Sequence, residues 1–141
     1  MTVTAPPRAA AAIAAGVLAV LDGVWFLLGT FWWSLVTGLG QSDLLVPGQI
    51  ADAVIGLLLV LGGVSLLARV AAGRVLCLFA AGLALVATVV DAVLRSRLVL
   101  FLVGGPTGLG DPLVRGIVIS APLVVLLVLA ALPDTRRWTH R

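Results

Sequence analysis

Four long apolar runs occupy most of this chain and decide what it can fold into. They comprise residues 9–36, 48–68, 75–94 and 113–132. Each run is long enough to cross a hydrocarbon core of about 30 Å at about 1.5 Å per helical residue. A soluble domain is about 45–50% apolar, whereas this chain is 62% hydrophobic and 11% charged. Because backbone groups in lipid need hydrogen-bond partners within their own segment, the sequence predicts an all-α bundle of four transmembrane helices.

The chain also contains an internal repeat. Residues 37–40 and 107–110 both have the sequence Thr-Gly-Leu-Gly, and Asp22 and Asp91 precede the two copies at similar distances. Polar matches in register carry weight in so apolar a chain, and we interpret them as a tandem duplication of one helical hairpin. The predicted organisation is an N-terminal tail, two hairpin repeats and a basic C-terminal tail, at residues 1–8, 9–70, 71–132 and 133–141 respectively.

The arginines predict the topology, since the chain has no lysine. With four crossings, one side of the membrane receives Arg8, Arg69, Arg74 and the C-terminal residues Arg136, Arg137 and Arg141. The positive-inside rule makes that side cytoplasmic, so both termini are expected inside, in a bacterial cytoplasmic membrane. The two hairpins then run in the same direction, as parallel repeats. The basic residues set orientation in this interpretation, and no nucleic-acid partner is expected.

Glycine has two expected roles. The Thr-Gly-Leu-Gly copies fall in predicted outer loops, where glycine suits tight turns, and no Lys or Ser/Thr follows them at P-loop spacing. Within the runs, glycines permit close helix contacts, although no Gly-xxx-Gly pair occurs among the five considered, at positions 56, 62, 63, 73 and 82.

Ionisable side chains within the predicted helices gather in the outer half of the bilayer. Asp22 and Asp91 reach it from the cytoplasmic side, and Asp52 and Arg115 reach roughly the same depth from the outer side. The full predicted polar belt consists of Asp22, Trp25, Asp52, Asp91, Arg95, Arg115 and Ser120. Ser120 belongs to it as the counterpart of Asp52 in the second repeat. Because charges in a membrane are costly unless they are paired or hydrated, the belt is a candidate functional site.

Most members of the belt have a structural alternative. Asp91 and Arg95 are spaced i, i+4 in the order that favours a local ion pair, Arg115 can extend to the interface, and Asp52 can be hydrated at a helix start. Asp22 differs from them, because its neighbours one turn away offer a carboxylate no partner: Leu18, Ala19, Trp25 and Phe26. Asp22 therefore needs a partner on another helix, or it stays protonated.

The favoured function is a small polytopic membrane protein with an outward-facing polar site. Such a protein binds a lipophilic ligand or serves as an accessory subunit, with the bilayer, a lipophilic small molecule, other membrane helices or a second copy as partners. The alternative is an intramembrane isomerase or cyclase with Asp22 and Asp91 as acid and base. A proton-coupled transporter is disfavoured, because the predicted inner half contains no ionisable residue. With one cysteine and one histidine, no metal site and no cofactor is predicted.

Overall fold

A computed structural model describes residues 9–37, 45–94 and 112–139 of the chain. This part is helical throughout, apart from short turns, and contains no strand. Its helices are α1 (Ala9–Thr37), α2 (Leu45–Leu67), α3 (Ala71–Leu94), α5 (Pro112–Ala131) and the short α6 (Pro133–Trp138). All four apolar runs are therefore helical, and the all-α prediction is confirmed.

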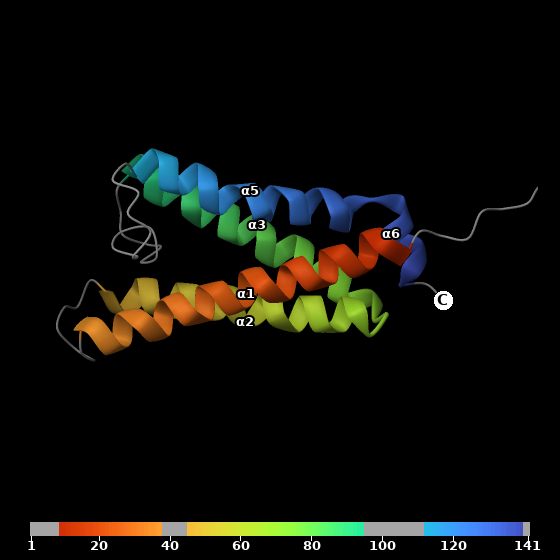
Figure 1. Cartoon of the computed structure of the whole chain (residues 1–141), viewed down its shortest axis with the longest axis horizontal. Coiled ribbons are helices and arrows are strands. Elements are labelled where there is room, and N and C mark those ends of the chain that lie inside the picture. Colours follow the sequence, from red (N-terminus) through yellow and green to blue (C-terminus); the bar gives the residue numbers. More distant parts are fainter. Residues whose placement is uncertain (1–8, 38–44, 95–111, 140–141) are drawn as a thin grey trace, which may run out of the picture.

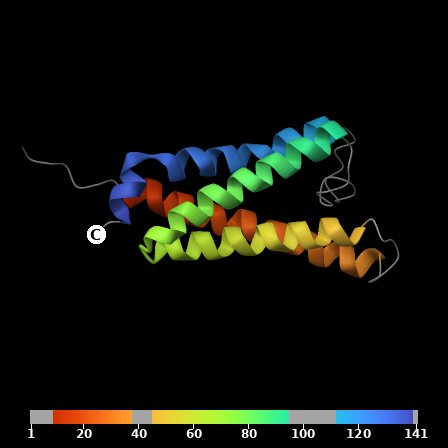
Figure 2. The ribbon, with the colours of Figure 1, turned by 180° about the vertical axis from the view of Figure 1, so that it is seen from behind.

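The long helices form a bundle in which each helix packs against two others. Helix α1 packs against α2 and α5, and α3 packs against the same two helices. Figures 1 and 2 show that the α1–α2 pair and the α3–α5 pair converge near α6 and splay apart toward the opposite end. The bundle is thus held together tightly at one end and opens toward the other.

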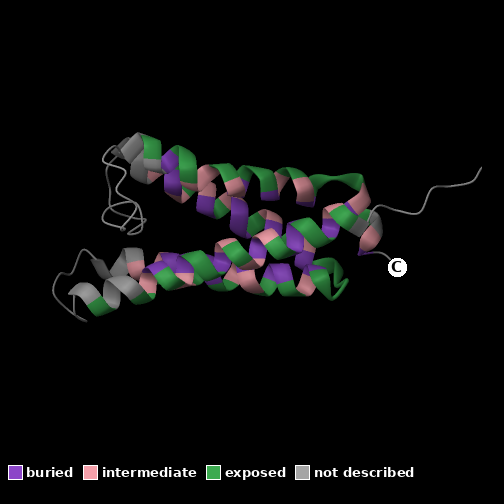
Figure 3. Ribbon diagram, in the orientation of Figure 1, coloured by how far each residue is buried: buried purple, intermediate pink, exposed green. Residues whose placement is uncertain are grey.

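Within the described residues, three helices are long and apolar enough to cross a membrane, over Ala10–Phe31, Gln49–Leu67 and Ala71–Val90. The apolar stretch of α5, Gly116–Ala131, is shorter. Buried residues follow the inward faces of the helices (Figure 3), and large apolar side chains such as Phe31, Phe79 and Ile117 are exposed on the outside. An apolar exterior of this kind is compatible with an integral membrane protein.

Glycines bring the backbones of α1 and α2 into direct contact. A Cβ atom at Gly23 would lie 2.7 Å from the Gly56 carbonyl oxygen, and one at Gly56 would lie 2.9 Å from the Gly23 carbonyl oxygen. Gly16 and Gly63 form a second pair, with corresponding distances of 3.2 and 2.7 Å. Only glycine fits such close contacts. At Gly82, by contrast, no atom of the described residues lies within 4 Å of an added Cβ, so the expected close contact is not formed there with them.

The turn between α2 and α3 ends α2 with a Schellman motif. The Val70 N–H donates to the Ser65 carbonyl at 2.9 Å, and the Arg69 N–H donates to the Leu66 carbonyl at 3.1 Å. Arg69 has a φ of 63°, the left-handed conformation that this motif requires and that glycine usually supplies. The turn reverses the chain at the end of the bundle where α6 lies (Figure 1).

Arg74 joins α3 to the C-terminal end of α5. Its Nε donates to the Ala130 carbonyl at 2.8 Å, and its Nη2 donates to the Ala131 carbonyl at 3.4 Å. Carbonyls in the last turn of a helix have no helical N–H partner, and a cation there is also favoured by the helix dipole. Arg74 therefore caps α5 from a neighbouring helix.

Helix α6 folds back over the same end, where the sequence suggested only a basic tail. The Thr135 hydroxyl donates to the Leu129 carbonyl at 2.7 Å. The Arg69 guanidinium carbon lies 4.1 Å from the centroid of the Trp138 ring, in a cation–π contact. Helix α6 is thereby attached to the α2–α3 turn.

Candidate functional site

A cavity of about 490 Å³ lies between α1 and α5. Sites of about 300–1,000 Å³ commonly hold small organic ligands. Helix α1 contributes Leu18, Leu21, Asp22, Val24, Trp25, Phe26 and Leu28, and α5 contributes Val118, Ile119, Pro122 and Leu123. Within this described lining, Asp22 is the one ionisable residue. The cavity is therefore an apolar space with a single carboxyl.

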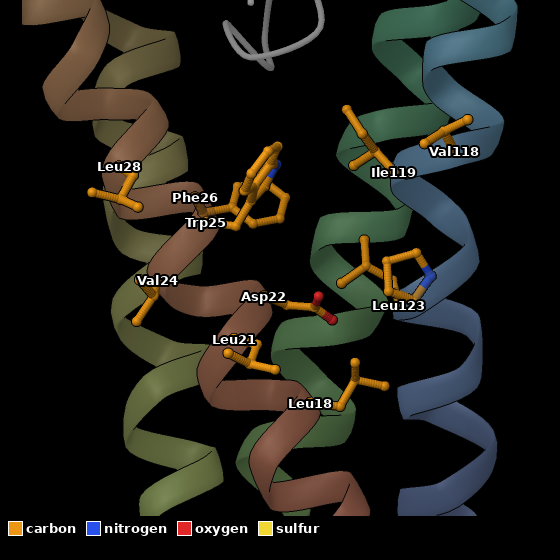
Figure 4. Close-up of a pocket in the computed structure, with 11 residues that line it drawn as sticks. Leu18, Leu21, Asp22, Val24, Trp25, Phe26, Leu28, Val118, Ile119 and Leu123 are labelled. Carbon is orange, nitrogen blue, oxygen red and sulfur yellow. The ribbon is translucent and has the colours of Figure 1, made fainter. Parts of the chain in front are cut away.

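The Asp22 side chain points from α1 into the space that faces α5 (Figure 4). Its orientation follows from the glycine contact: Gly23 faces α2, and successive residues of a helix are rotated by about 100°. The Asp22 Oδ2 atom is buried and has no hydrogen-bond partner among the described residues. A buried acceptor atom of this kind is costly to leave without a donor.

Two aromatic rings line the cavity one turn beyond Asp22. Trp25 and Phe26 follow it by three and four residues, so all three share one face of α1. Phe26 is buried and Trp25 is exposed, and Figure 4 shows both rings beside the space that Asp22 enters. Aromatic faces attract cations and also provide apolar contact area. The α1 wall therefore combines a carboxyl with two π-systems.

The predicted polar belt is only partly assembled around this cavity. Asp22 and Trp25 both line it, whereas Asp52 and Ser120 are not among the lining residues. Asp52 is fully buried on α2, and Ser120 is half-buried on α5.

The glycine contact also revises the depth of Asp52. Gly56 lies opposite Gly23, and Asp52 is one turn before Gly56 on an antiparallel helix. It therefore lies more than one turn beyond Asp22, toward the splayed end, rather than at about the same depth.

Three further members of the belt cannot be placed at side-chain level. Asp91 lies in the last turn of α3 and Arg115 in the first turn of α5, but their side chains are outside the described residues. Arg95 is also outside the described residues. The pairings of Asp91 with Asp22 and with Arg95 stay predictions.

The α5 wall of the cavity was not singled out from the sequence. Ile119 and Leu123 are ordinary apolar residues of a membrane helix, and nothing in the sequence reveals that they face Asp22. Pro122 carried the one available signal, because a proline inside a helix removes a backbone hydrogen bond. Only the packing of α5 against α1 shows where that defect lies.

Comparisons of the chain with known protein families, with curated proteins and with solved structures found no match. The fold and the cavity therefore define the protein by class. The part of the chain that the structure describes is a helical bundle with three helices long enough to cross a membrane and an apolar cavity that carries one carboxyl.

Proposed function

We propose that this protein is a multi-pass membrane protein that binds a lipophilic ligand in the cavity between α1 and α5. The observation that carries this proposal is the position of the Asp22 carboxyl, which enters a cavity of about 490 Å³ with otherwise apolar and aromatic walls. A carboxyl within a membrane is costly and marks a functional site by default. A ligand in the cavity would fill the space between the apolar walls and give Asp22 a partner.

In the proposed membrane arrangement, α5 is the fourth crossing. Its 20 residues span about 30 Å, the thickness of a hydrocarbon core. The α6 end, which carries Arg69, Arg74 and Arg136, is the cytoplasmic end under the positive-inside rule. Asp22 lies 13 residues after Ala9 at the start of α1, or about 20 Å along the helix. The cavity then belongs to the outer half of the membrane.

An intramembrane isomerase or cyclase is the second candidate. One observation favours it: the Asp22 carboxyl shares the cavity with Trp25 and Phe26. A neutral carboxyl acid can protonate an olefin or epoxide, and aromatic faces stabilise the cation that forms. In this candidate the protein binds its ligand in the same cavity and also converts it to a product.

Mass spectrometry of gently extracted protein tests the proposal. Ile119→Phe places a larger side chain in the cavity, while Val124→Phe is the matched control on an exposed position of the same helix. We expect the wild type and Val124→Phe to retain the same small lipophile and Ile119→Phe to lose most of it.

Equal retention by all three proteins would contradict the proposal, and so would the absence of any lipophile. Retention of another membrane protein in place of a small molecule would favour an accessory subunit. If the purified protein converts the retained molecule, and Asp22→Asn abolishes that conversion while the variant still folds, the protein is an enzyme.

A further inference from the structure

We infer that the ligand of this cavity carries a hydrogen-bond-donating head group, as a lipophilic amine or alcohol does. Its donors would face the Asp22 carboxyl on α1 and the backbone carbonyl of Val118 on α5. This inference rests on the proposed function and specifies the chemistry of its ligand.

Pro122 supplies the second acceptor. It lies inside α5 and has no N–H, so the carbonyl four residues earlier, at Val118, lacks its helical donor. The proline ring also crowds that carbonyl and tilts it away from the helix axis. Val118 and Pro122 both line the cavity, so the carbonyl lies on the face of α5 that borders it. An unsatisfied carbonyl at membrane depth is costly, and a ligand donor would remove that cost.

Asp22 is the acceptor on the opposite wall. Its Oδ2 atom is buried and makes no hydrogen bond with the described residues, and the side chain points toward α5 (Figure 4). A carboxyl offers at least one acceptor oxygen whether or not it is protonated. Among the described lining side chains, the indole of Trp25 is the one group with a permanent N–H donor. In this inference each wall of the cavity thus contributes one acceptor, the Asp22 carboxyl on α1 and the Val118 carbonyl on α5.

Charge and aromatic contacts rank the possible head groups. An ammonium group has three donors and pairs with a carboxylate, and the faces of Trp25 and Phe26 attract cations. A hydroxyl donates one hydrogen bond, and an ether donates none. The expected order of occupancy is therefore amine, then alcohol, then ether on the same hydrocarbon chain.

Photo-crosslinking in lipid nanodiscs tests this order. The probes are dodecylamine, dodecanol and dodecyl methyl ether, each with a diazirine in the chain, and peptide mass spectrometry measures labelling of the α1 and α5 cavity walls. Labelling at the lipid-facing residue Phe79 of α3 corrects for differences in membrane concentration. After this correction, the amine should label the cavity about tenfold or more above the ether, since a hydrogen bond to a charged group has about that effect on affinity.

Two variants test the two proposed acceptors, and a third serves as the control. Asp22→Leu should remove the amine preference, and Pro122→Ala, which restores an N–H for the Val118 carbonyl, should reduce it by about twofold to tenfold. Ser120→Ala is the control, because Ser120 does not line the cavity, and it should leave the preference unchanged.

Two results would count against the inference, and they are distinguishable. If all three probes label the cavity equally in the wild type, the donor requirement is wrong while the lipophilic site stands. If no probe labels the cavity walls above Phe79, the ligand site itself is wrong and the inference fails with it. The wild-type comparison alone decides both points, even if a variant does not fold.

Discussion

At the scale of single residues, the α1–α2 contact depends on glycines that cannot accept a methyl group. Replacing Gly23 with alanine would place a Cβ 2.7 Å from the Gly56 carbonyl oxygen and 2.8 Å from the Val60 nitrogen. These are backbone atoms, so the helices would have to move apart. We expect Gly23→Ala to lower the free energy of unfolding by about 1–3 kcal/mol, the usual cost of overpacking, as measured by thermal or denaturant unfolding in detergent.

Gly82→Ala provides the control for that prediction. It lies within α3, and nothing is within 4 Å of an added Cβ. Alanine is also the better helix former, by up to about 1 kcal/mol in water. Gly82→Ala should therefore leave stability unchanged or raise it. A similar loss of stability in both variants would mean that glycine matters for some reason other than the α1–α2 contact.

For Asp22 we predict the opposite effect from that at Gly23: its replacement should raise the free energy of unfolding. An aspartate at the centre of a membrane helix costs about 2.5–3.5 kcal/mol, and the Oδ2 atom of Asp22 has no hydrogen-bond partner among the described residues. Asp22→Leu should therefore raise the free energy of unfolding by about 1–2 kcal/mol, part of that cost, in ligand-free protein. Asp22→Asn keeps a polar group of the same size and should have a smaller effect.

A loss of folded protein in Asp22→Leu would contradict this prediction. Asp22 would then be a structural residue paired with a side chain outside the described residues. The same result for Asp91→Asn would extend the structural role to the second repeat.

The sequence singled out some of these residues and missed others for a physical reason. Asp22 can be singled out from the sequence, because a carboxyl within an apolar run is costly whichever helix it packs against. The glycine pairs were missed because they are spaced by seven residues, which suits two antiparallel helices with left-handed crossing, and not by the four residues considered. The role suggested for Pro122 depends on which helix it faces, and one chain segment read alone does not contain that information.

At the scale of elements, Arg74 makes the end of α5 depend on α3. Arg74→Lys keeps the positive charge, and thus the topology signal, but cannot reproduce the two donors that reach the Ala130 and Ala131 carbonyls. We expect it to lower the free energy of unfolding by about 1 kcal/mol, as measured by denaturant unfolding in detergent. Arg136→Lys, at an exposed position of α6, is the matched control and should have little effect. Equal effects would show that the two carbonyl contacts add nothing beyond charge.

The helix boundaries show how much of the secondary structure can be predicted from the apolar pattern of the sequence. The four long helices follow the apolar runs closely, and each of their ends lies within four residues of the end of its run. Helix α6 was missed because Pro133 and the following basic residues suggested the end of structure. Proline is also favoured in the first turn of a helix, and α6 begins at Pro133 with Asp134 in its first turn. Whether Pro133 ends the structure or begins a helix depends on the contact of Trp138 with Arg69, and that contact joins distant parts of the chain.

At the scale of the whole molecule, the number of crossings determines where the chain ends. Four crossings place both termini on the cytoplasmic side, whereas three would separate them. In a Cys77→Ala background, which removes the single native cysteine, we expect a membrane-impermeant maleimide to label Ser42→Cys in intact cells. Arg141→Cys should be labelled only after the cells are permeabilised.

Labelling of Arg141→Cys in intact cells would contradict this topology and exclude α5 as a crossing in the proposed orientation. Labelling of Ser42→Cys only after permeabilisation would reverse the orientation. A cysteine at Thr2 serves as a further control, because it should behave like Arg141→Cys in a four-helix arrangement.

The contact between Arg69 and Trp138 joins an early part of the chain to a late one, so it can form only near the end of synthesis. The glycine contacts of α1 with α2 join neighbouring segments, so this hairpin can pair while the ribosome is still synthesising α3. Helix α5 and Trp138 emerge last, and only then can the α6 end of the bundle close and α5 complete the cavity opposite Asp22. Until that moment the carboxyl faces lipid or another protein. A ribosome stalled before α5 should therefore hold a paired but unfinished hairpin, which a membrane chaperone would need to shield.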